Sequence, residues 1–217
     1  MDIEKLLANL HQQPGDIREM VEKQIIARGI KDQNVIKAFQ NVDRKLFVPK
    51  KSHAIAYADQ PVPIGHSQTI SQPYVVAFMT EYLDVNKDSK VLEIGSGCGY
   101  QTAILSEIAK EVYTIEVISE LVELAKMNLR NAKTNNFQIF NKNGRDGLEE
   151  HAPFDRIIVT AGGTDIPEKL IEQLSDNGKM IIPVGKQFDH QELLLITKED
   201  NKIRKESILP VRFVPLV

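Results

Sequence analysis

Hydrophobic residues follow two different periods along the chain, and the change between them falls near residue 73. Between residues 14 and 46, apolar positions recur at helical spacing, with Gly29 as a natural stop and Asp32 as a natural cap for a second helix. From residue 47 to 73, prolines and glycines interrupt every period. We expect a long irregular stretch with short strands there, and a loop of that length in a compact domain is usually functional.

A helical run at Val75–Leu83 is followed by strand-like runs that alternate with helical ones. The strand-like runs are Val91–Ile94, Val112–Glu116, Phe137–Asn141, Arg156–Thr160, Lys179–Val184 and Glu192–Lys198. The helical runs between them are Gln101–Ala109, Glu120–Asn131 and Pro167–Leu174. This alternation predicts an α/β fold, a doubly wound and mostly parallel sheet with helices on both faces. Helices cease after Val184, so the last strands are predicted to form an antiparallel edge.

A chain of 217 residues is long enough for one well-buried domain and short for two. We therefore treat residues 1–217 as a single domain, with helices and loops in residues 1–80 and an α/β core with C-terminal strands in residues 81–217. Lys and Arg number 27 and Asp and Glu number 30, so the formal net charge of −3 offers no electrostatic footprint for nucleic acid.

The sequence indicates a protein of a reducing compartment. Its one cysteine, Cys98, cannot form an intramolecular disulfide. No window approaches the ~18 apolar residues of a membrane span, and Met1–Asn9 lacks the apolar run of a signal peptide. The five histidines are scattered without the spacing of metal ligands. We expect a cytoplasmic protein with neither membrane contact nor metal.

The most informative local motif is Val91–Tyr100, in which a buried strand leads into Gly95, Gly97 and Gly99 and then into a helix. Glycines let the backbone turn tightly and approach a ligand, and the helix that follows offers free N–H groups. The next strand ends in Glu116, whose carboxylate can hold both hydroxyls of a ribose. We therefore expect a nucleotide-type cofactor, and a plain strand–helix turn is the alternative.

The spacing of the glycines limits the possible cofactors but does not identify one. Dinucleotide folds prefer G-x-G-x-x-G, whereas here the third glycine comes one position early and Tyr100 stands in its place. The form E-x-G-x-G-x-G resembles the first motif of S-adenosylmethionine methyltransferases, although the glycines alone leave a dinucleotide open. Cys98 has no neighbouring His or Lys in sequence to lower its thiol pKa, so we interpret it as a small loop residue and not a nucleophile.

A second motif, IGHSQTISQPYVVA at Ile64–Ala77, resembles the protein-L-isoaspartate O-methyltransferase family. Further blocks match the same family from the neighbourhood of Met20 onward. They are RKLFVP at Arg44–Pro49, AYAD at Ala56–Asp59, APFDRIIVTA at Ala152–Ala161, GKMIIPVG at Gly178–Gly185 and PVRFVPL at Pro210–Leu216. The QTISQP block is specific to the family, whereas the glycine motif is generic to the superfamily.

The resemblance implies a Rossmann-like methyltransferase fold and S-adenosyl-L-methionine as the cofactor. It implies methyl transfer to the free α-carboxylate of L-isoaspartyl residues in damaged proteins and peptides. In the family, the ester collapses to a succinimide that reopens partly to normal aspartate, which is repair. Two alternatives remain: a methyltransferase for another carboxylate or small molecule, and a catalytically silent nucleotide-binding interaction module.

Residue by residue, the resemblance makes Ser71 the active-site serine of a substrate loop, and Val211–Leu216 part of the peptide groove. No metal ligand is implied. The residues implied to bind the cofactor are Gln68, Thr69, Ile70, Ser71, Glu93, Gly95, Ser96, Gly97, Gly99, Glu116, Val117, Asn143 and Gly144.

Two positions depart from the family's pattern. Asn143 stands where the family usually has an aspartate beside the adenine. Its amide oxygen can still accept a hydrogen bond from the adenine amino group, but it lacks the negative charge of an aspartate. Ser67 stands where the family often has glycine, and serine is strained there if the position needs a positive φ.

Methyl transfer to a carboxylate needs no general base, because the ordinary pKa of the acid lies near ~4. What the protein must supply is alignment of the reacting atoms. No G-x-S-x-G elbow surrounds Ser71, so we expect its hydroxyl to position the substrate carboxylate and not to form a covalent bond. Capping of a helix that begins at Gln72 and Pro73 is the alternative role for Ser71. His66 is interpreted as a loop residue.

Two polar clusters are assigned to structure. Asp165–Glu168 has the form of a capping box with Pro167 just inside a helix. Lys202–Lys205 is interpreted as a solvated turn between acidic residues.

Overall fold

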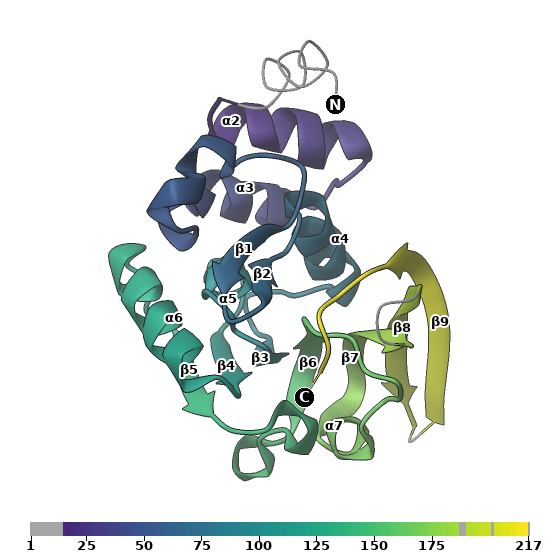
Figure 1. Cartoon of the computed structure of the whole chain (residues 1–217). Helices are drawn as coiled ribbons and strands as arrows, with labels where there is room; N and C mark the ends of the chain where they lie inside the picture. Colours follow the sequence, from purple (N-terminus) through teal and green to yellow (C-terminus); the bar gives the residue numbers. More distant parts are fainter. Residues whose placement is uncertain (1–14, 187–189, 201, 217) are drawn as a thin grey trace.

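A seven-stranded sheet forms the centre of the computed structural model, which describes residues 15–186, 190–200 and 202–216. The strand order is β5-β4-β3-β6-β7-β8-β9 (Figure 1). The strands are β3 (Lys90–Ile94), β4 (Glu111–Glu116), β5 (Phe137–Asn141), β6 (Phe154–Val159), β7 (Leu174–Gly185), β8 (Gln191–Glu199) and β9 (Lys202–Val211). The first five are parallel to one another, whereas β8 and β9 pair in antiparallel fashion, which confirms the predicted antiparallel edge.

The chain changes direction across the sheet between β3 and β6. From β3 it runs outward through β4 to β5, then returns to place β6 on the other side of β3. Loops after β3 and β6 therefore diverge from adjacent strands and leave a crevice at their carboxyl ends. Ligands of doubly wound sheets bind at such a point.

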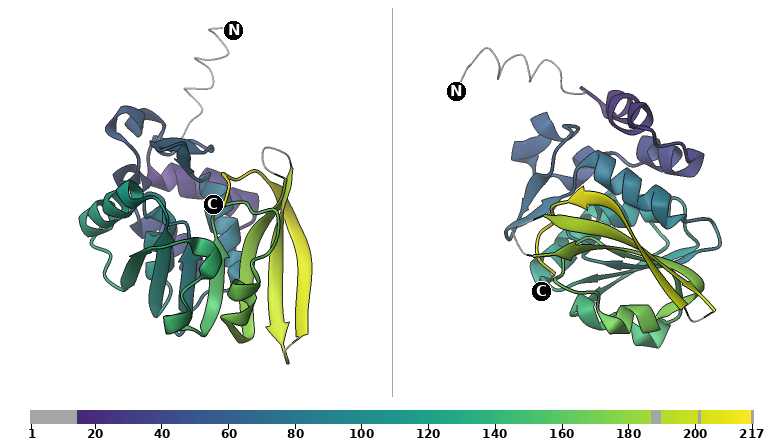
Figure 2. Two further views of the ribbon diagram at one scale, coloured as in Figure 1. Left: turned by 60° about the horizontal axis from the view of Figure 1, so that its bottom comes forward. Right: turned by 90° about the vertical axis from the view of Figure 1, so that its right-hand side faces the viewer.

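Helices cover both faces of the sheet, as the strand–helix alternation predicts. On one face lie α4 (Pro73–Leu83), α5 (Tyr100–Ser106) and α6 (Ser119–Asn131), and on the other lies the short α7 (Glu168–Glu172), as Figure 2 shows. Alternate residues of each strand enter two separate cores, so that Val91 and Ile158 face the first while their neighbours Leu92 and Ile157 face the second. The fold is therefore the expected doubly wound α/β fold.

The N-terminal part packs against the first face, over α4 and α5 (Figure 1). Helix α2 (Ile17–Met20) continues through a π turn and a 3₁₀ turn to Gly29, which has a φ of 97° and ends it as predicted. Helix α3 (Gln33–Asn41) begins at Asp32, whose carboxylate accepts the N–H groups of Asn34 and Val35 at 2.7 and 3.3 Å. The helix stop at Gly29 and the helix cap at Asp32, both predicted from the sequence, are confirmed.

The irregular stretch after α3 holds two 3₁₀ helices and one small hairpin. The 3₁₀ helices span Arg44–Phe47 and Lys50–Ile55, and the hairpin consists of β1 (Val62–Gly65) and β2 (Gln68–Ile70). Arg44 is fully buried; its Nε donates to the Ala56 carbonyl at 2.8 Å and its guanidinium lies over the Tyr100 ring. The segment is thus fixed to the start of α5 at its first turn, which brings the hairpin above the carboxyl ends of the strands.

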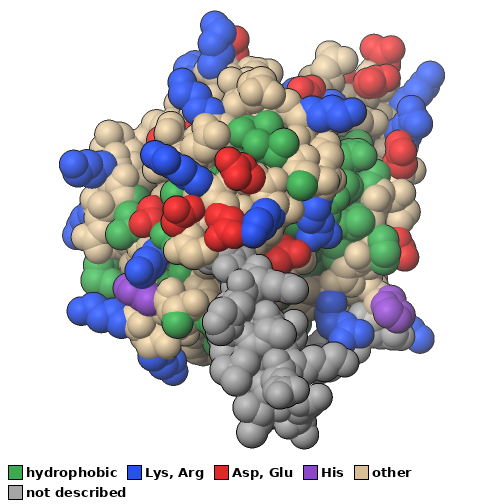
Figure 3. Space-filling model, turned by 90° about the horizontal axis from the view of Figure 1, so that it is seen from above, with side chains coloured by type: hydrophobic (Ala, Val, Ile, Leu, Met, Phe, Trp, Pro, Cys, Tyr) green, Lys and Arg blue, Asp and Glu red, His purple; other side chains and the backbone are tan. Residues whose placement is uncertain are grey.

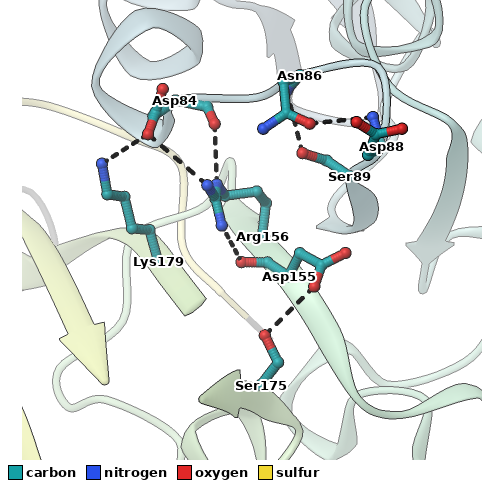
Figure 4. A network of polar contacts seen from close by, with 8 residues as sticks. All are labelled: Asp84, Asn86, Asp88, Ser89, Asp155, Arg156, Ser175 and Lys179. Atoms are coloured by element: carbon teal, nitrogen blue, oxygen red, sulfur yellow. Dashed lines mark hydrogen bonds and ion pairs between the residues drawn. The ribbon is translucent and has the colours of Figure 1, made fainter. Parts of the chain in front are cut away.

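The far end of α4 is anchored to two interior strands of the sheet, β6 and β7 (Figure 4). Asp84, which follows α4, pairs with Lys179 of β7 at 3.0 Å, and its carbonyl accepts from Arg156 of β6 at 3.0 Å. The Arg156 side chain is only 12% exposed, so this contact is less screened than a surface pair. Because α4 begins at Pro73, shortly after β2, the anchor fixes the direction in which the chain leaves the hairpin and enters the helix.

Two structural interpretations of the sequence are wrong. Asp165 caps no helix: it pairs with Arg145 at 2.7 Å, and α7 starts after Pro167 without a side-chain cap. Lys202–Lys205 is not a turn but the start of β9, which pairs with β8 in the register Lys198↔Ile203. An edge strand that is largely exposed carries charges much as a turn does, and this misled the interpretation.

The surface above the N-terminal helices mixes Lys and Arg with Asp and Glu, and no single charge dominates it (Figure 3). Within the described residues, no helix is long and apolar enough to cross a membrane. The predicted absence of a signal peptide in Met1–Asn9 concerns residues outside the described part of the chain.

Candidate active site

The glycine loop after β3 turns back on itself through three left-handed residues. Gly95, Gly97 and Gly99 have φ values of 95°, 51° and 89°, which favour glycine strongly. The N–H groups of Gly95 and Ser96 donate to the Ile115 carbonyl at 2.8 and 3.2 Å, so the loop is tied to β4. A Cβ on Gly95 would lie 2.5 Å from the Thr160 hydroxyl oxygen. Because Gly95 has no Cβ, the loop backbone can lie directly against Thr160, the residue that follows β6.

Glu116 at the end of β4 holds the glycine loop from the other side. The residue is 7% exposed, and its Oε2 accepts the N–H of Gly97 at 2.9 Å. Its Oε1 accepts the N–H of Ile118 at 3.0 Å. A carboxylate has about four acceptor sites, so two remain for hydroxyl groups of a ligand. This is the geometry that binding of a ribose diol requires.

A pocket opens between the glycine loop, the end of β4 and the β1–β2 hairpin. Its lining comes from six separate parts of the chain: Gln68, Thr69, Ile94, Gly95, Gly97, Ile115, Glu116, Val117, Ile118, Gly144, Thr160, Ala161, Val214, Pro215 and Leu216. Seven of the residues implied by the family resemblance lie here: Gln68, Thr69, Gly95, Gly97, Glu116, Val117 and Gly144. Segments that are distant in the sequence thus meet where the topology places a ligand.

Three further predicted residues, Ile70, Ser71 and Ser96, line a smaller hollow that shares Thr69, Gly95, Gly97 and Thr160 with the main pocket. The other three predicted residues line neither. Gly99 packs against Leu129, where a Cβ would lie 3.0 Å from the Cγ atom. Asn143 is exposed, and its Oδ1 accepts the N–H of Arg145 at 2.9 Å. The third, Glu93, lies inside the sheet.

Glu93 is a fully buried carboxyl group on β3. The Thr102 hydroxyl donates to its Oε2 at 2.5 Å, and its Oε1 has no hydrogen-bond partner among the described residues. Burial raises the pKa of Glu93 to about 7, and the nearby Glu116 carboxylate adds to that rise. Glu93 thus supports the loop from beneath and is held partly neutral near pH 7.

A groove of about 480 Å³ lies beside the cofactor pocket. Its described lining is Pro61, Thr69, Ser71, Gln72, Val75, Thr160, His190, Pro210, Val211, Arg212, Phe213 and Val214, none of them acidic. Thr69, Thr160 and Val214 line both spaces, so the groove and the pocket adjoin at these residues. Ser71 lies in the groove wall. Gln72, not Ser71, occupies the N-cap position of α4, so the alternative capping role of Ser71 is wrong.

The β1–β2 hairpin that brings Gln68 and Thr69 into the pocket turns at His66 and Ser67. Their φ values are 50° and 58°, so both are left-handed, as a type I′ hairpin turn demands. Ser67 therefore occupies the strained conformation that the sequence comparison with glycine anticipated. The same hairpin places the Ile64 side chain next to Gly97.

The C-terminal strap, residues 211–216, was only partly anticipated. Residues 211–214 line the groove, and residues 214–216 line the pocket beside the glycine loop. Gly162 donates to the Val214 carbonyl at 2.7 Å and accepts from Leu216 at 2.8 Å. Gln191, 1% exposed, accepts the N–H of Phe213 at 2.7 Å and donates to its carbonyl at 3.5 Å. The sequence did not mark Gln191 or Thr160 as residues of the site, since all it showed was that each lies near the end of a strand.

The site fits the implied cofactor and excludes one alternative chemistry. A glycine loop that leaves space for a ligand faces a carboxylate with two free acceptor sites, which suits the ribose and the methionine part of S-adenosylmethionine. Cys98 is buried and burial raises its pKa to about 11, so the thiol is not an activated nucleophile. Within the described residues, no group of three His, Cys, Asp or Glu side chains could hold a metal ion.

Together the fold and the pocket define a nucleotide-cofactor-binding protein of the doubly wound methyltransferase class. The model of the protein-L-isoaspartate(D-aspartate) O-methyltransferase family matches residues 16–217, and the chain belongs to that family.

Individual relatives agree with this assignment. The chain is 51% identical over 201 residues to a protein-L-isoaspartate O-methyltransferase of Geobacter metallireducens, covering 92% of this chain and 93% of that one. It is 53% identical over 188 residues to one of Dictyoglomus turgidum, covering 87% and 85% of the two chains. A Plasmodium falciparum structure described as this methyltransferase in complex with S-adenosyl-L-homocysteine matches with a TM-score of 0.82 at 30% identity, over 94% of this chain and 99% of that one.

Replacing Gly95 by alanine should weaken cofactor binding selectively. The new Cβ would clash with Thr160, and the left-handed backbone costs a non-glycine residue ~1–2 kcal/mol. Gly29→Ala is the matched control, because Gly29 has a φ of 97° but nothing within 4 Å of its Cβ position. Both variants should unfold more easily, and only Gly95→Ala should bind S-adenosyl-L-homocysteine more weakly by calorimetry. Equal affinities in the two variants would contradict the role given to Gly95.

Glu93 should make stability depend on pH. Its folded pKa of about 7 lies above the ordinary 4.5, so between these values the folded state binds more protons than the unfolded state. The free energy of unfolding should therefore fall as pH rises through this window, by up to about 3 kcal/mol, and level off above it. Urea unfolding of the native protein and of Glu93→Gln at pH ~5 and ~8 tests this. Identical pH profiles for the two proteins would show that Glu93 is not the cause.

Proposed function

We propose that this protein transfers a methyl group from S-adenosyl-L-methionine to the α-carboxylate of L-isoaspartyl residues in damaged proteins and peptides. The observation that carries the proposal is the shared wall of the two spaces. Thr69, Thr160 and Val214 line both the cofactor pocket and the groove, so a bound cofactor and an extended peptide meet there. The family membership and the S-adenosyl-L-homocysteine complex of the Plasmodium falciparum relative support the same reaction.

The cofactor residues take these roles. Gly95 and Gly97 give the methionine part access to the backbone, and Glu116 accepts from the two ribose hydroxyls. Val117, an apolar side chain left 43% exposed beside the pocket, offers a flat contact for the adenine. Gly144 lines the pocket on the adenine side, where a Cβ would lie 2.2 Å from Ile94 Cγ2, and Asn143 directly precedes it in the chain. When bound, the cofactor supplies a methyl group already activated by the sulfonium.

The groove residues position the acceptor. The substrate carboxylate is ionised at neutral pH without help, so no base is required. The Ser71 hydroxyl donates a hydrogen bond to it and turns one oxygen toward the pocket. The negative charge of the carboxylate is lost as the methyl ester forms, so a strong cationic clamp would hold the reactant more tightly than the transition state. A hydroxyl donor is the better choice, and it fits a wall formed by Ser71, Gln72 and Val75.

The whole chain acts as one domain in this proposal, with residues 1–80 contributing the substrate loop and residues 81–217 the cofactor site. The damaged proteins are the only macromolecular partners that the reaction needs. We place the protein in the cytoplasm, which the single buried thiol of Cys98 supports.

The proposal is tested with two peptides that differ only in one linkage, isoaspartyl or aspartyl. Incubation with methyl-labelled S-adenosyl-L-methionine should give base-labile methyl ester on the isoaspartyl peptide alone. Ser71→Ala should lower the turnover number by roughly 10- to 100-fold, because a hydrogen bond to a charged group is worth ~1.5–3 kcal/mol. Label on neither peptide, with the cofactor still bound, would favour a different acceptor or a silent module. A methylated or acylated Ser71 in the mass spectrum would refute its positioning role.

Asn143→Asp should bind the cofactor more tightly than the native protein. The amide oxygen of Asn143 is already used to accept the Arg145 N–H, whereas an aspartate keeps that bond and adds a charged acceptor. A charge-assisted hydrogen bond is roughly twice as strong as a neutral one, so we expect a gain of about fivefold in affinity. Calorimetric titration of both proteins with S-adenosyl-L-homocysteine measures it. Equal affinities would show that residue 143 does not contact the adenine amino group.

A further inference from the structure

Strand β7 begins with a bulge that carries an asparagine–glycine pair. Its register with β6 passes from Phe154↔Leu174 directly to Arg156↔Lys179, and its pairing with β8 begins only at Lys179. Residues 175–178 therefore have no ladder partner on either side. Asn177 within this bulge is exposed, with a φ of 61°. The structure gives no hydrogen bond to its side chain within the described residues.

One anchor is at the first residue of the bulge and another lies directly after it. Ser175 donates to Asp155 at 3.4 Å, and Lys179 pairs with Asp84 at 3.0 Å (Figure 4). Between these fixed points the backbone of Asn177 and Gly178 can change its torsion angles without breaking a strand pair. Such a segment opens at a low local free energy compared with the paired strands.

The chain has a second asparagine–glycine pair, Asn143-Gly144, and it is held differently. Asn143 Oδ1 accepts the N–H of Arg145 at 2.9 Å and its carbonyl accepts from Asp146 at 3.4 Å. The Gly144 carbonyl accepts from Gly147 at 3.1 Å. The side chain and the backbone of this pair are thus both fixed by the 3₁₀ turn, whereas those of Asn177 are not.

An aspartate–glycine pair, Asp146-Gly147, lies in the same turn. An aspartate cyclises through its neutral carboxyl group, and here Lys169 at 2.8 Å lowers the pKa of Asp146 and keeps the group ionised. Of the three pairs, Asn177-Gly178 is the one that the fold leaves free to react.

We propose that Asn177 deamidates through Gly178 and makes damaged copies of this protein a substrate of intact ones. The Gly178 nitrogen bonds to Asn177 Cγ and gives up its proton, and the side-chain NH2 group takes up a proton and leaves as ammonia, which gives a succinimide. Glycine favours this step because no Cβ hinders its nitrogen. Water then opens the ring and leaves an isoaspartyl residue, whose extra main-chain methylene the unpaired bulge can accommodate. This self-repair rests on the proposed function.

The reaction has to take place between two molecules. Asn177 lies near the amino end of β7, which runs parallel to β6 and β3. The groove lies at the carboxyl ends of those strands, on the opposite edge of the sheet. The α-carboxylate of a damaged residue 177 therefore reaches the groove of another copy and not its own.

The test uses protein aged at mildly alkaline pH without cofactor. Peptide mapping that separates aspartyl from isoaspartyl products should find deamidation at Asn177 roughly fivefold or more faster than at the capped Asn143. Aged protein is then mixed with fresh enzyme and methyl-labelled S-adenosyl-L-methionine. Base-labile label should appear on the peptide that contains residue 177.

Asn177→Gly is the informative variant, because glycine accepts a positive φ without strain and cannot deamidate. Aged Asn177→Gly should accept little label, whereas Asn131→Gln, changed at an exposed asparagine that precedes alanine, should accept as much as the native protein. Deamidation at Asn143 equal to that at Asn177, or an isoaspartyl residue 177 left unlabelled while an isoaspartyl control peptide is methylated, would overturn the proposal. Failure to label the control peptide as well would overturn the proposed function and the self-repair with it.

Discussion

Two hydrogen bonds accepted by the Glu116 carboxylate hold the cofactor end of the molecule together. One goes to Gly97 in the loop after β3 and the other to Ile118 in the loop after β4. Both loops leave adjacent parallel strands and would otherwise diverge. The carboxylate binds both loops through backbone N–H groups. The loop conformation depends on glycine at the left-handed positions and on an acid at the end of β4.

The two halves of the site are joined by the C-terminal strap, which crosses the ends of β6 and β7. Gly162 and Gln191 fix its backbone by hydrogen bonds, and Val214 faces both the pocket and the groove. Any displacement of the strap therefore alters both spaces together. Gly162 has no room for a side chain, because a Cβ there would lie 2.2 Å from the Gln191 side chain that also binds the strap. Alignment of donor and acceptor is what methyl transfer requires, and one strap serves both.

The sequence predicts the parts of this architecture that depend on neighbours along the chain. The glycine loop, the Asp32 cap, the Gly29 stop and the alternation of strands with helices are local patterns of spacing, and the structure confirms them. Gln191 and Thr160 could not be predicted, since their roles come from strands that meet only in the folded chain. The capping box at Asp165 fails for the same reason: its local pattern is right, but an ion pair with Arg145 from another loop takes the carboxylate.

Charge in the site is kept low by burial as well as by composition. Glu93 and Glu116 lie on adjacent parallel strands, and both carboxylates would raise the negative potential around a cationic cofactor. Glu116 is tied by two N–H groups at the pocket surface, whereas Glu93 is sealed inside with one oxygen unpartnered, which raises its pKa to about 7. Glu93 thus tends toward its neutral form, while Glu116 in the pocket wall accepts hydrogen bonds. Of these two acids only Glu116 then presents its carboxylate to the pocket, and the described lining of the groove contains no acid that would repel a carboxylate ligand.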